Sequence, residues 1–221
     1  MNSLQHDFIR FAVQADVLCF GQFITKAGRT SPYFFNSGLF NDGLMLGTLA
    51  DFYARTLINS GTAFDMLYGP AYKGIPLVSA VAIALANHGH NTPFAFNRKM
   101  PKDHGEGGTL VGAPLEGRII IVDDVISAGT SVNESVKIIR HAGAEPAGVL
   151  IALDRMERSG KDGALSELSA VQEVQRVYGI PVMPIATLND LIDYLSEQKS
   201  ADVFSQHLDA INAYRARYGS T

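Results

Sequence analysis

The sequence has one cysteine, no tryptophan and no long apolar run. Cys19 cannot form an intramolecular disulfide, which favours a reducing compartment, and it is expected to be a small buried apolar residue. No segment approaches the roughly 18 apolar residues of a membrane-spanning helix, and no basic-then-apolar leader begins the chain. We therefore expect a cytoplasmic protein with no membrane partner.

Charge of neither sign dominates. The chain has 18 lysines and arginines against 22 aspartates and glutamates, a net charge of −4 at pH 7. Such a balance does not predict a nucleic-acid or membrane surface, so we expect no nucleic-acid partner. The motifs GxSxG, HExxH, CxxC and GxGxxG are also absent, which argues against the common hydrolase, zinc and dinucleotide-binding classes.

Helical periodicity alternates with short apolar runs along the chain, the pattern of an α/β fold with a central parallel sheet flanked by helices. The length fits one domain over residues 1–221. Residues 1–40 fit the alternation poorly and are expected to form a small cap joined to the sheet. Strands are predicted at 66–68, 94–97, 119–122, 149–153 and 182–185, and helices at 7–15, 42–59, 75–87, 131–142, 165–178, 190–197 and 203–218.

The segment RIIIVDDVISAGTS, residues 118–131, is the most informative. Residues 119–122 are β-branched, as in a strand buried on both faces of a parallel sheet. Asp123 and Asp124 follow at its carboxyl end, where open α/β sheets bind ligands, and are expected to be exposed. A small-residue turn then leads to a helix whose amino terminus suits a phosphate. The expected caps of this helix are Thr130, Ser131 and Asn133.

The lysine of a nucleotide-binding P-loop is missing from this turn. Two carboxylates beside a phosphate cradle suit a sugar phosphate: the acids accept hydrogen bonds from vicinal hydroxyls, directly or through a divalent cation, and backbone amides hold the phosphate. The alternative is a solvated loop or a magnesium pocket of another α/β enzyme. The segment resembles the phosphoribosyl pyrophosphate signature of the type I phosphoribosyltransferases.

Residues 25–35, TKAGRTSPYFF, place Lys26 and Arg29 around a glycine, ahead of a Ser-Pro turn and three aromatic residues. Taken alone, the stretch predicts a hairpin with core aromatics. It also resembles the amino-terminal pattern of the orotate phosphoribosyltransferases, which the purine-salvage members of the fold class lack.

Two further segments carry cations. Tyr72 and Lys73 follow a Gly-Pro turn after a short strand, where backbone amides and the lysine can hold an anion. A second cationic segment at residues 96–108 has the composition of a mobile solvated connection, which is also what a closing lid requires. In the resembled family the first segment holds pyrophosphate, and the second enters the active site of the neighbouring subunit.

Asp154 and Arg155 end another predicted strand, and a guanidinium there can pair with a planar, oxygen-rich base. The family places Arg155 and Ser127 on orotate. Most members carry threonine where this chain has Ser127, so one methyl group is missing. The segment 158–164 is longer than in some relatives, and the sequence gives it no role.

The resemblance covers nearly the whole chain. It implies a type I phosphoribosyltransferase fold whose first 40 residues form a hood over the active site. It also implies a homodimer that shares the lid at residues 99–108, and Mg²⁺ held mainly by the substrate. The implied catalytic residues are Lys26, Lys102, His104, Asp123 and Asp124. The implied contacts with phosphoribosyl pyrophosphate are Lys26, Tyr72, Lys73, Arg98, Lys99, Lys102, His104, Asp123, Asp124, Val125, Ile126, Ser127, Ala128, Gly129, Thr130 and Ser131, and those with orotate are Phe34, Phe35, Ser127 and Arg155.

The implied reaction joins orotate to the phosphoribosyl group of 5-phospho-α-D-ribose 1-diphosphate, giving orotidine 5′-phosphate and pyrophosphate in de novo pyrimidine biosynthesis. Two alternatives stay open. One is a purine phosphoribosyltransferase, which would not need the segment 25–35. The other is a regulatory protein that senses phosphoribosyl pyrophosphate without turning it over, and which could dispense with the cationic lid.

Overall fold

A six-stranded sheet forms the centre of the structure, a computed structural model that describes residues 3–25, 27–102, 108–161, 164–197 and 202–220. Its strands lie in the order β10-β7-β6-β3-β4-β5, and all neighbours are parallel except β4 and β5. This arrangement confirms the predicted α/β class. The strands are β3 (Met66–Gly69), β4 (Phe94–Lys102), β5 (Gly108–Gly112), β6 (Arg118–Val122), β7 (Glu145–Asp154) and β10 (Val182–Thr187).

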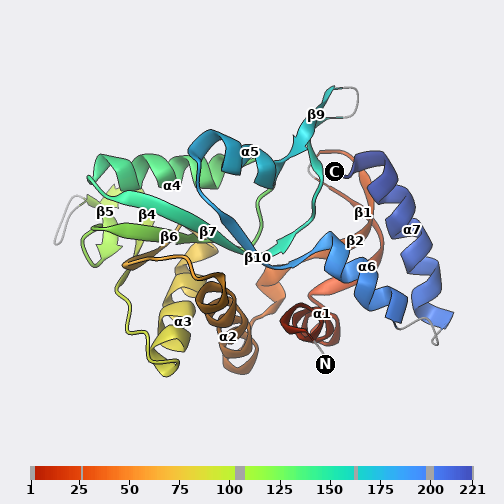
Figure 1. The fold of residues 1–221 in the computed structure, drawn as a ribbon, viewed down its shortest axis with the longest axis horizontal. Coiled ribbons are helices and arrows are strands. Elements are labelled where there is room, and N and C mark those ends of the chain that lie inside the picture. The colour runs from red at the N-terminus through yellow and green to blue at the C-terminus, as the bar shows by residue number, and fades with distance from the viewer. Residues whose placement is uncertain (1–2, 26, 103–107, 162–163, 198–201, 221) are drawn as a thin grey trace.

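Helices cover both faces of this sheet (Figure 1). On one face lie α1 (Leu4–Gln14), α2 (Gly43–Ser60) and α3 (Gly74–Asn87), and on the other α4 (Thr130–His141) and α5 (Ala170–Tyr178). Strand β6 serves both layers: Ile120 and Val122 pack with the first group, Ile119 and Ile121 with the second. Burial on both faces is why these four residues form an unbroken apolar run.

The strand order reverses between β3 and β6. From β3 the chain passes outward to β4, and from β6 it passes to β7 on the other side. In the shared register Tyr68 pairs with Ile121 and Val122 with Leu150, so the carboxyl ends of β3, β6 and β7 lie side by side. Open parallel sheets bind their ligands at such a switch point. The fold therefore gathers the predicted functional loops at one edge.

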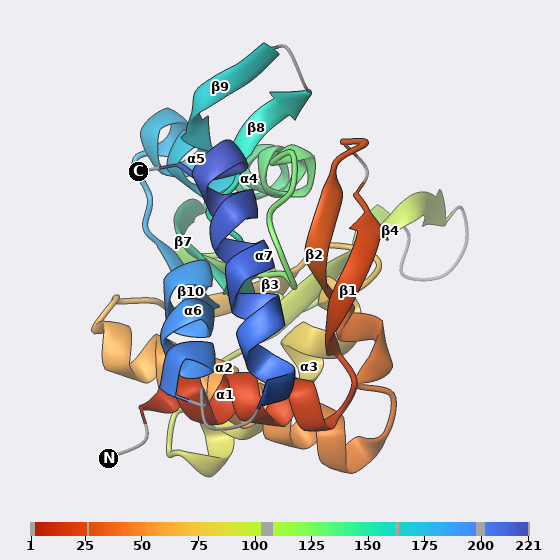
Figure 2. The same ribbon diagram turned by 90° about the vertical axis from the view of Figure 1, so that its right-hand side faces the viewer.

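The antiparallel hairpin of β1 (Leu18–Ile24) and β2 (Thr30–Phe35) stands apart from the main sheet. It packs against α7 (Asp202–Tyr218), which in turn lies along α6 (Leu188–Glu197) (Figure 2). Helix α1 instead packs against β10 and contributes buried Phe8 and Ile9 to the main core. Whether the first 40 residues act as a hood stays a prediction.

The predicted helix at 165–178 is wrong in its first turn. Residues Ala164–Ser169 form β9, which pairs with β8 (Arg158–Lys161) in a small antiparallel sheet. Helix α5 begins only after Ser169, whose hydroxyl accepts from the Gln172 amide while the Gln172 side chain accepts from the Ser169 amide. This capping box sets the start of the helix.

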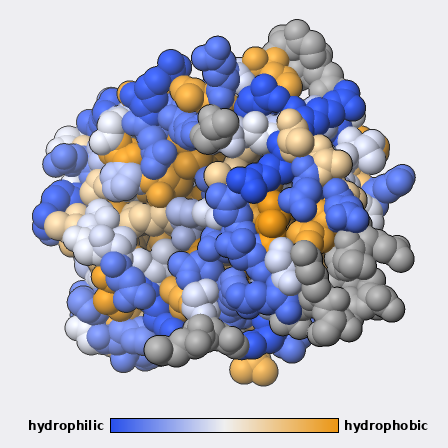
Figure 3. Space-filling view, turned by 45° about the vertical axis from the view of Figure 1, so that its right-hand side comes forward, coloured by the Kyte–Doolittle hydropathy of each residue, from blue (hydrophilic) through white to orange (hydrophobic). Residues whose placement is uncertain are grey.

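Cys19 is partly exposed, where a buried residue was expected, and its thiol donates to the Asp16 carbonyl at 3.1 Å. In the described part of the chain no helix is long and apolar enough to cross a membrane. Figure 3 shows one face of the molecule, on which hydrophilic side chains are interspersed with smaller apolar groups.

Candidate active site at the carboxyl edge of the sheet

Asp123 and Asp124 follow β6, and both are buried, with only 7% of each residue exposed. The expectation that they are exposed was wrong, because neighbouring loops cover them and supply hydrogen bonds. Ser131 donates its hydroxyl to Asp123 Oδ2 at 2.8 Å, and the Asp124 amide donates to Asp123 Oδ1 at 2.9 Å. Burial, and secondly the charge of Asp124, raise the pKa of Asp123 to about 6.

The loop after the acid pair turns into α4 at Gly129, whose φ of +68° suits glycine. Gly129 takes the N-cap position and no side chain caps the helix, so the predicted caps Thr130, Ser131 and Asn133 are wrong. The Ser131 hydroxyl bonds to Asp123 instead. The start of α4 therefore offers backbone N–H groups without a side-chain cap, beside the exposed residues Ser127 and Ala128.

The turn between β3 and α3 is tightly packed. A Cβ on Gly69 would lie 2.2 Å from the Gly74 carbonyl oxygen, so both positions need glycine. The Ala71 amide donates to Asn97 Oδ1 at 2.8 Å, which joins this turn to β4. Lys73, directly before α3, is held at the sheet edge by this geometry.

Lys73 reaches across to the acid pair. Its Nζ lies 2.6 Å from Asp124 Oδ2, and the Ser37 hydroxyl donates to the same oxygen at 2.6 Å. The sequence predicted an anion beside Lys73, and in the structure this anion is the carboxylate of Asp124. Two segments that the resemblance assigns to the same substrate are thus in direct contact.

Strand β4 brings two more predicted residues to this edge. The Lys99 ammonium lies 5.1 Å from the centre of the Tyr72 ring, a cation–π contact that joins β4 to the loop after β3. Arg98 is partly buried, and its Nη1 has no hydrogen-bond partner among the described residues. Three predicted residues lie outside this description: Lys26, His104 and the side chain of Lys102.

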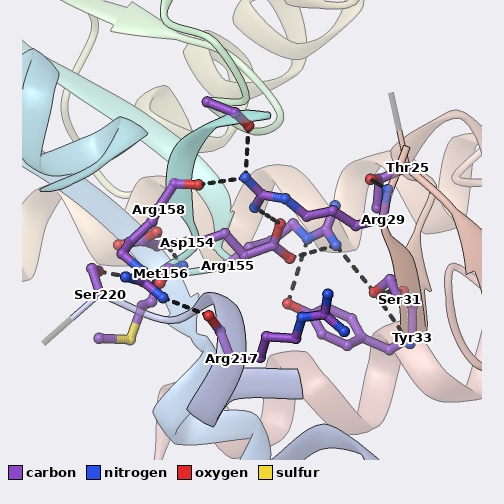
Figure 4. A network of polar contacts seen from close by, with 12 residues as sticks. Thr25, Arg29, Ser31, Tyr33, Asp154, Arg155, Met156, Arg158, Arg217 and Ser220 are labelled. Carbon is purple, nitrogen blue, oxygen red and sulfur yellow. Dashed lines mark hydrogen bonds and ion pairs between the residues drawn. The ribbon is translucent and has the colours of Figure 1, made fainter. Parts of the chain in front are cut away.

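Arg155 follows β7 and is held by the β1–β2 hairpin (Figure 4). Its Nη2 donates to Ser31 Oγ at 3.2 Å, and its Nε lies 3.4 Å from the Tyr33 hydroxyl. Glu157 Oε1 lies 2.6 Å from the same Nη2. Because the Ala152 amide donates to the Asp124 carbonyl at 2.9 Å, Arg155 belongs to a segment that runs beside the acid loop.

Phe34 and Phe35 point to opposite faces of β2, as neighbours in a strand do. The half-exposed Phe34 stacks on Phe23 with ring centres 5.4 Å apart, whereas Phe35 packs on Phe8 toward the main core. Their contact with orotate stays a prediction.

Several residues of this edge had no signal in the sequence. Ser37 contacts Asp124, the Tyr53 hydroxyl donates to the Asp123 carbonyl at 2.8 Å, and Glu157 contacts Arg155. Each comes from a segment far along the chain or from a loop without a motif. Only the three-dimensional arrangement could identify them.

A cavity of about 510 Å³ lies between the β1–β2 hairpin and α7, lined in part by Arg29, Ser31 and Tyr214. Among the described residues, none of those predicted to bind phosphoribosyl pyrophosphate lines this cavity, whereas several lie at the sheet edge. Among the described residues, no group of three or more histidine, cysteine, aspartate or glutamate side chains could hold a metal ion.

Comparison with known proteins decides the family. The model of the phosphoribosyl transferase domain matches residues 41–175. The orotate phosphoribosyltransferase of Herminiimonas arsenicoxydans is 66% identical over the full length of both chains, and that of Janthinobacterium sp. is 64% identical over 99% of both. This chain belongs to the orotate phosphoribosyltransferases. The type I phosphoribosyltransferase fold and the pentosyltransferase activity predicted from the sequence are confirmed.

Solved structures of orotate phosphoribosyltransferases agree. The enzyme from Francisella tularensis has a TM-score of 0.85 at 41% identity, over 97% of this chain and 100% of that one. A Mycobacterium tuberculosis enzyme in complex with 5-phospho-α-D-ribosyl 1-diphosphate shares the fold, with a TM-score of 0.58 at 16% identity, over 86% of this chain and 99% of that one. Full-length identity to orotate enzymes favours this family over the purine-salvage and regulatory alternatives.

The buried acid pair predicts a specific pH dependence of stability. The pKa of Asp123 is raised from 3.8 to about 6, so the folded chain holds this proton more tightly than the unfolded chain. As the pH rises from below 3.8 to above about 6, ionisation of Asp123 therefore destabilises the fold by about 1–3 kcal/mol. Asp123→Asn should remove that loss, because its amide can donate to the Ser131 hydroxyl.

Urea unfolding of the wild type and of Asp123→Asn at several pH values between about 4 and 7 measures this effect. As the pH rises, the unfolding free energy of the wild type should fall relative to that of Asp123→Asn. Parallel pH profiles would show that Asp123 titrates alike in the folded and unfolded chains.

Proposed function

We propose that the carboxyl edge of the sheet binds both substrates and transfers the phosphoribosyl group to orotate. The observation that carries this proposal is the contact between Lys73 and Asp124, which joins the predicted pyrophosphate loop to the predicted ribose loop. The solved Mycobacterium tuberculosis enzyme with the same fold binds 5-phospho-α-D-ribosyl 1-diphosphate, which supports the same ligand here.

Catalysis at this edge is chiefly electrostatic. As the bond between C1 and the diphosphate oxygen breaks, positive charge builds on the ribose ring and negative charge on the leaving group. Asp123 and Asp124 accept hydrogen bonds from the ribose hydroxyls, and Lys73 exchanges its carboxylate partner for the diphosphate. The amides at the start of α4, from Ala128 to Ser131, hold the 5′-phosphate. No covalent nucleophile is required.

The cofactor in this proposal is Mg²⁺, held mainly by oxygens of phosphoribosyl pyrophosphate. Mg²⁺ commonly uses one or two carboxylates together with substrate phosphates, and Asp123 and Asp124 are the oxygen donors of this edge that fit such a role. Their oxygens already accept hydrogen bonds from Ser131, Ser37 and Lys73, so most ligands of the ion would come from the substrate. When bound, the ion would neutralise charge on the departing pyrophosphate.

Arg155 and Ser127 bind orotate in this proposal, and residues 1–40, which include Phe34 and Phe35, form the hood. Arg155 suits the role because its planar guanidinium can donate two parallel hydrogen bonds to an oxygen-rich base. We place the enzyme in the cytoplasm as a homodimer. Each subunit lends its lid, with Lys99, Lys102 and His104, to the site of its partner.

The test of the reaction uses purified chain, phosphoribosyl pyrophosphate and Mg²⁺ with each base in turn. Orotate should be consumed, as followed by its absorbance, and orotidine 5′-phosphate and pyrophosphate should form in equal amounts. Hypoxanthine and adenine should be poor substrates. Faster turnover of either purine would assign the site to purine salvage, and substrate binding without turnover would support the regulatory alternative.

The shared lid predicts subunit complementation. Lys102→Ala should reduce kcat by about 10²–10³-fold if this cation acts on charge that develops in the transition state. Mixing inactive Lys102→Ala subunits with inactive Asp124→Asn subunits should restore activity, because one site of each mixed dimer is then intact. Random exchange makes about half of the dimers mixed, so about a quarter of wild-type activity is expected.

Each variant mixed with itself is the control, and subunit exchange is verified by mass spectrometry of differently tagged chains. Activity that stays at the level of the separate variants after full exchange would mean that each lid serves its own subunit.

A further inference from the structure

Glu157, three residues after the end of β7, lies between two arginines, Arg29 and Arg155. Its Oε1 lies 2.6 Å from Arg155 Nη2, and its Oε2 lies 3.6 Å from Arg29 Nη1. The side chains of Arg29, Glu157 and Arg155 are only 3%, 15% and 24% exposed. Two guanidinium groups and one carboxylate give this cluster a net charge of +1. Because the side chains are largely buried, water screens this charge only weakly.

The chain holds Arg155 by one side of its guanidinium. Nη2 contacts Glu157 and donates to Ser31 Oγ, and Nε lies within reach of the Tyr33 hydroxyl. The Ser31 hydroxyl donates to the Tyr33 carbonyl at 2.7 Å, so its oxygen is free to accept from Arg155. Nη1 of Arg155 makes no hydrogen bond to any described residue, and this leaves its two donors for a ligand.

Glu157 is itself firmly supported. Arg29, besides its ion pair with Glu157, donates to the Arg158 carbonyl at 2.9 Å and the Gly160 carbonyl at 2.7 Å. On the other side Glu157 forms a β-bridge with Gly219, next to the end of α7. The backbone of Glu157 is therefore fixed next to the carboxyl-terminal helix, and its carboxylate forms ion pairs with Arg29 and Arg155.

We propose that Glu157 is a positioning residue for the base: it clamps Arg155 Nη2 so that the two Nη1 donors face orotate. Arg29 neutralises Glu157, because a carboxylate left uncompensated beside Arg155 would repel the carboxylate of orotate. This inference rests on the proposed contact between Arg155 and orotate. It assigns specificity for the base to a cluster assembled from β2, the end of β7 and the residue after α7.

A simple charge model predicts the opposite effect of removing the carboxylate. Glu157→Gln makes the cluster more positive, which would tighten the binding of an anionic base if charge alone mattered. If position matters, the same change loosens Arg155 and weakens orotate binding. The direction of the change in KM therefore separates the two explanations.

The experiment measures kcat and both KM values for Glu157→Gln and Glu157→Asp. The aspartate keeps the charge but is one methylene shorter, so it cannot reach both arginines. Each variant should raise the KM for orotate about tenfold, because a displaced Arg155 makes a weaker charge-assisted hydrogen bond to the base. The KM for phosphoribosyl pyrophosphate and kcat should stay within about twofold, because the lost interaction is one of uniform base binding.

Glu173→Gln is the matched control. Glu173 accepts from the Ser159 hydroxyl at 2.6 Å beside the same β8–β9 hairpin but does not contact Arg155. The Glu173→Gln variant should leave the KM for orotate unchanged. A rise in this KM would show that any disturbance of the β8–β9 hairpin affects base binding. An equal rise of both substrate KM values in the Glu157 variants, or a lower orotate KM in Glu157→Gln, would overturn the proposal.

A double variant shows whether Glu157 acts through Arg155. Arg155→Ala should raise the orotate KM, and adding Glu157→Gln should raise it little further, because the group to be positioned is already gone. Multiplicative effects of the two changes would overturn the positioning role. An orotate KM unaffected by Arg155→Ala would show instead that the proposed base contact is wrong, and activity without orotate would show that the proposed reaction is wrong.

Discussion

The side-by-side pairing of β3 and β6 is the constraint on which the active site depends. These parallel strands end at the same edge of the sheet, where the order of the strands reverses, so the loops that follow them must meet. Lys73 and Asp124, 51 residues apart in sequence, are brought within 2.6 Å by this pairing. Asp124 is buried but the Lys73 side chain is 54% exposed, so solvent screens this ion pair and it adds little stability. In the proposed function the contact matters because it places a cation beside the acids assigned to the ribose.

In the proposed function the hairpin and the terminal helix position the base, and the sheet edge binds the sugar phosphate. Arg155 stands at the end of β7, one strand away from the acid loop, and β2 supplies Ser31 and Tyr33 to hold it. Under this proposal the two substrates contact different parts of the fold.

Sequence reasoning succeeded where a local pattern has one physical cause. Residues 119–122 form an apolar run because helices cover both faces of β6, as the sequence predicted. The Asp pair and Arg155 could be placed because open sheets bind ligands where strands end. The order of the predicted strands and helices followed from the same periodicities, whereas β4 and β7 extend beyond their predicted ranges and β5 was not predicted.

Long-range contacts could not be predicted. Asp123 and Asp124 are buried beside Ser37, Tyr53 and Ser131. Ser37 and Tyr53 are far from the acids in sequence, and no motif predicts their contact with them. Strand β9 was taken for helix because ALSELS carries no strict alternation, and only its pairing with β8 defines it. Glu157 belongs to no motif, because its proposed role depends on contacts with Arg29 and Arg155 that form only in the folded chain.

Calorimetric binding of phosphoribosyl pyrophosphate with Mg²⁺ to Lys73→Ala, Asp124→Asn and the double variant tests most directly whether the ends of β3 and β6 form one site. If the ends of β3 and β6 form one site, each single change weakens binding, and the double variant loses less than the sum of the two, with a coupling free energy of at least about 1 kcal/mol. Strictly additive losses would mean that Lys73 and Asp124 act on separate sites, which would contradict the account.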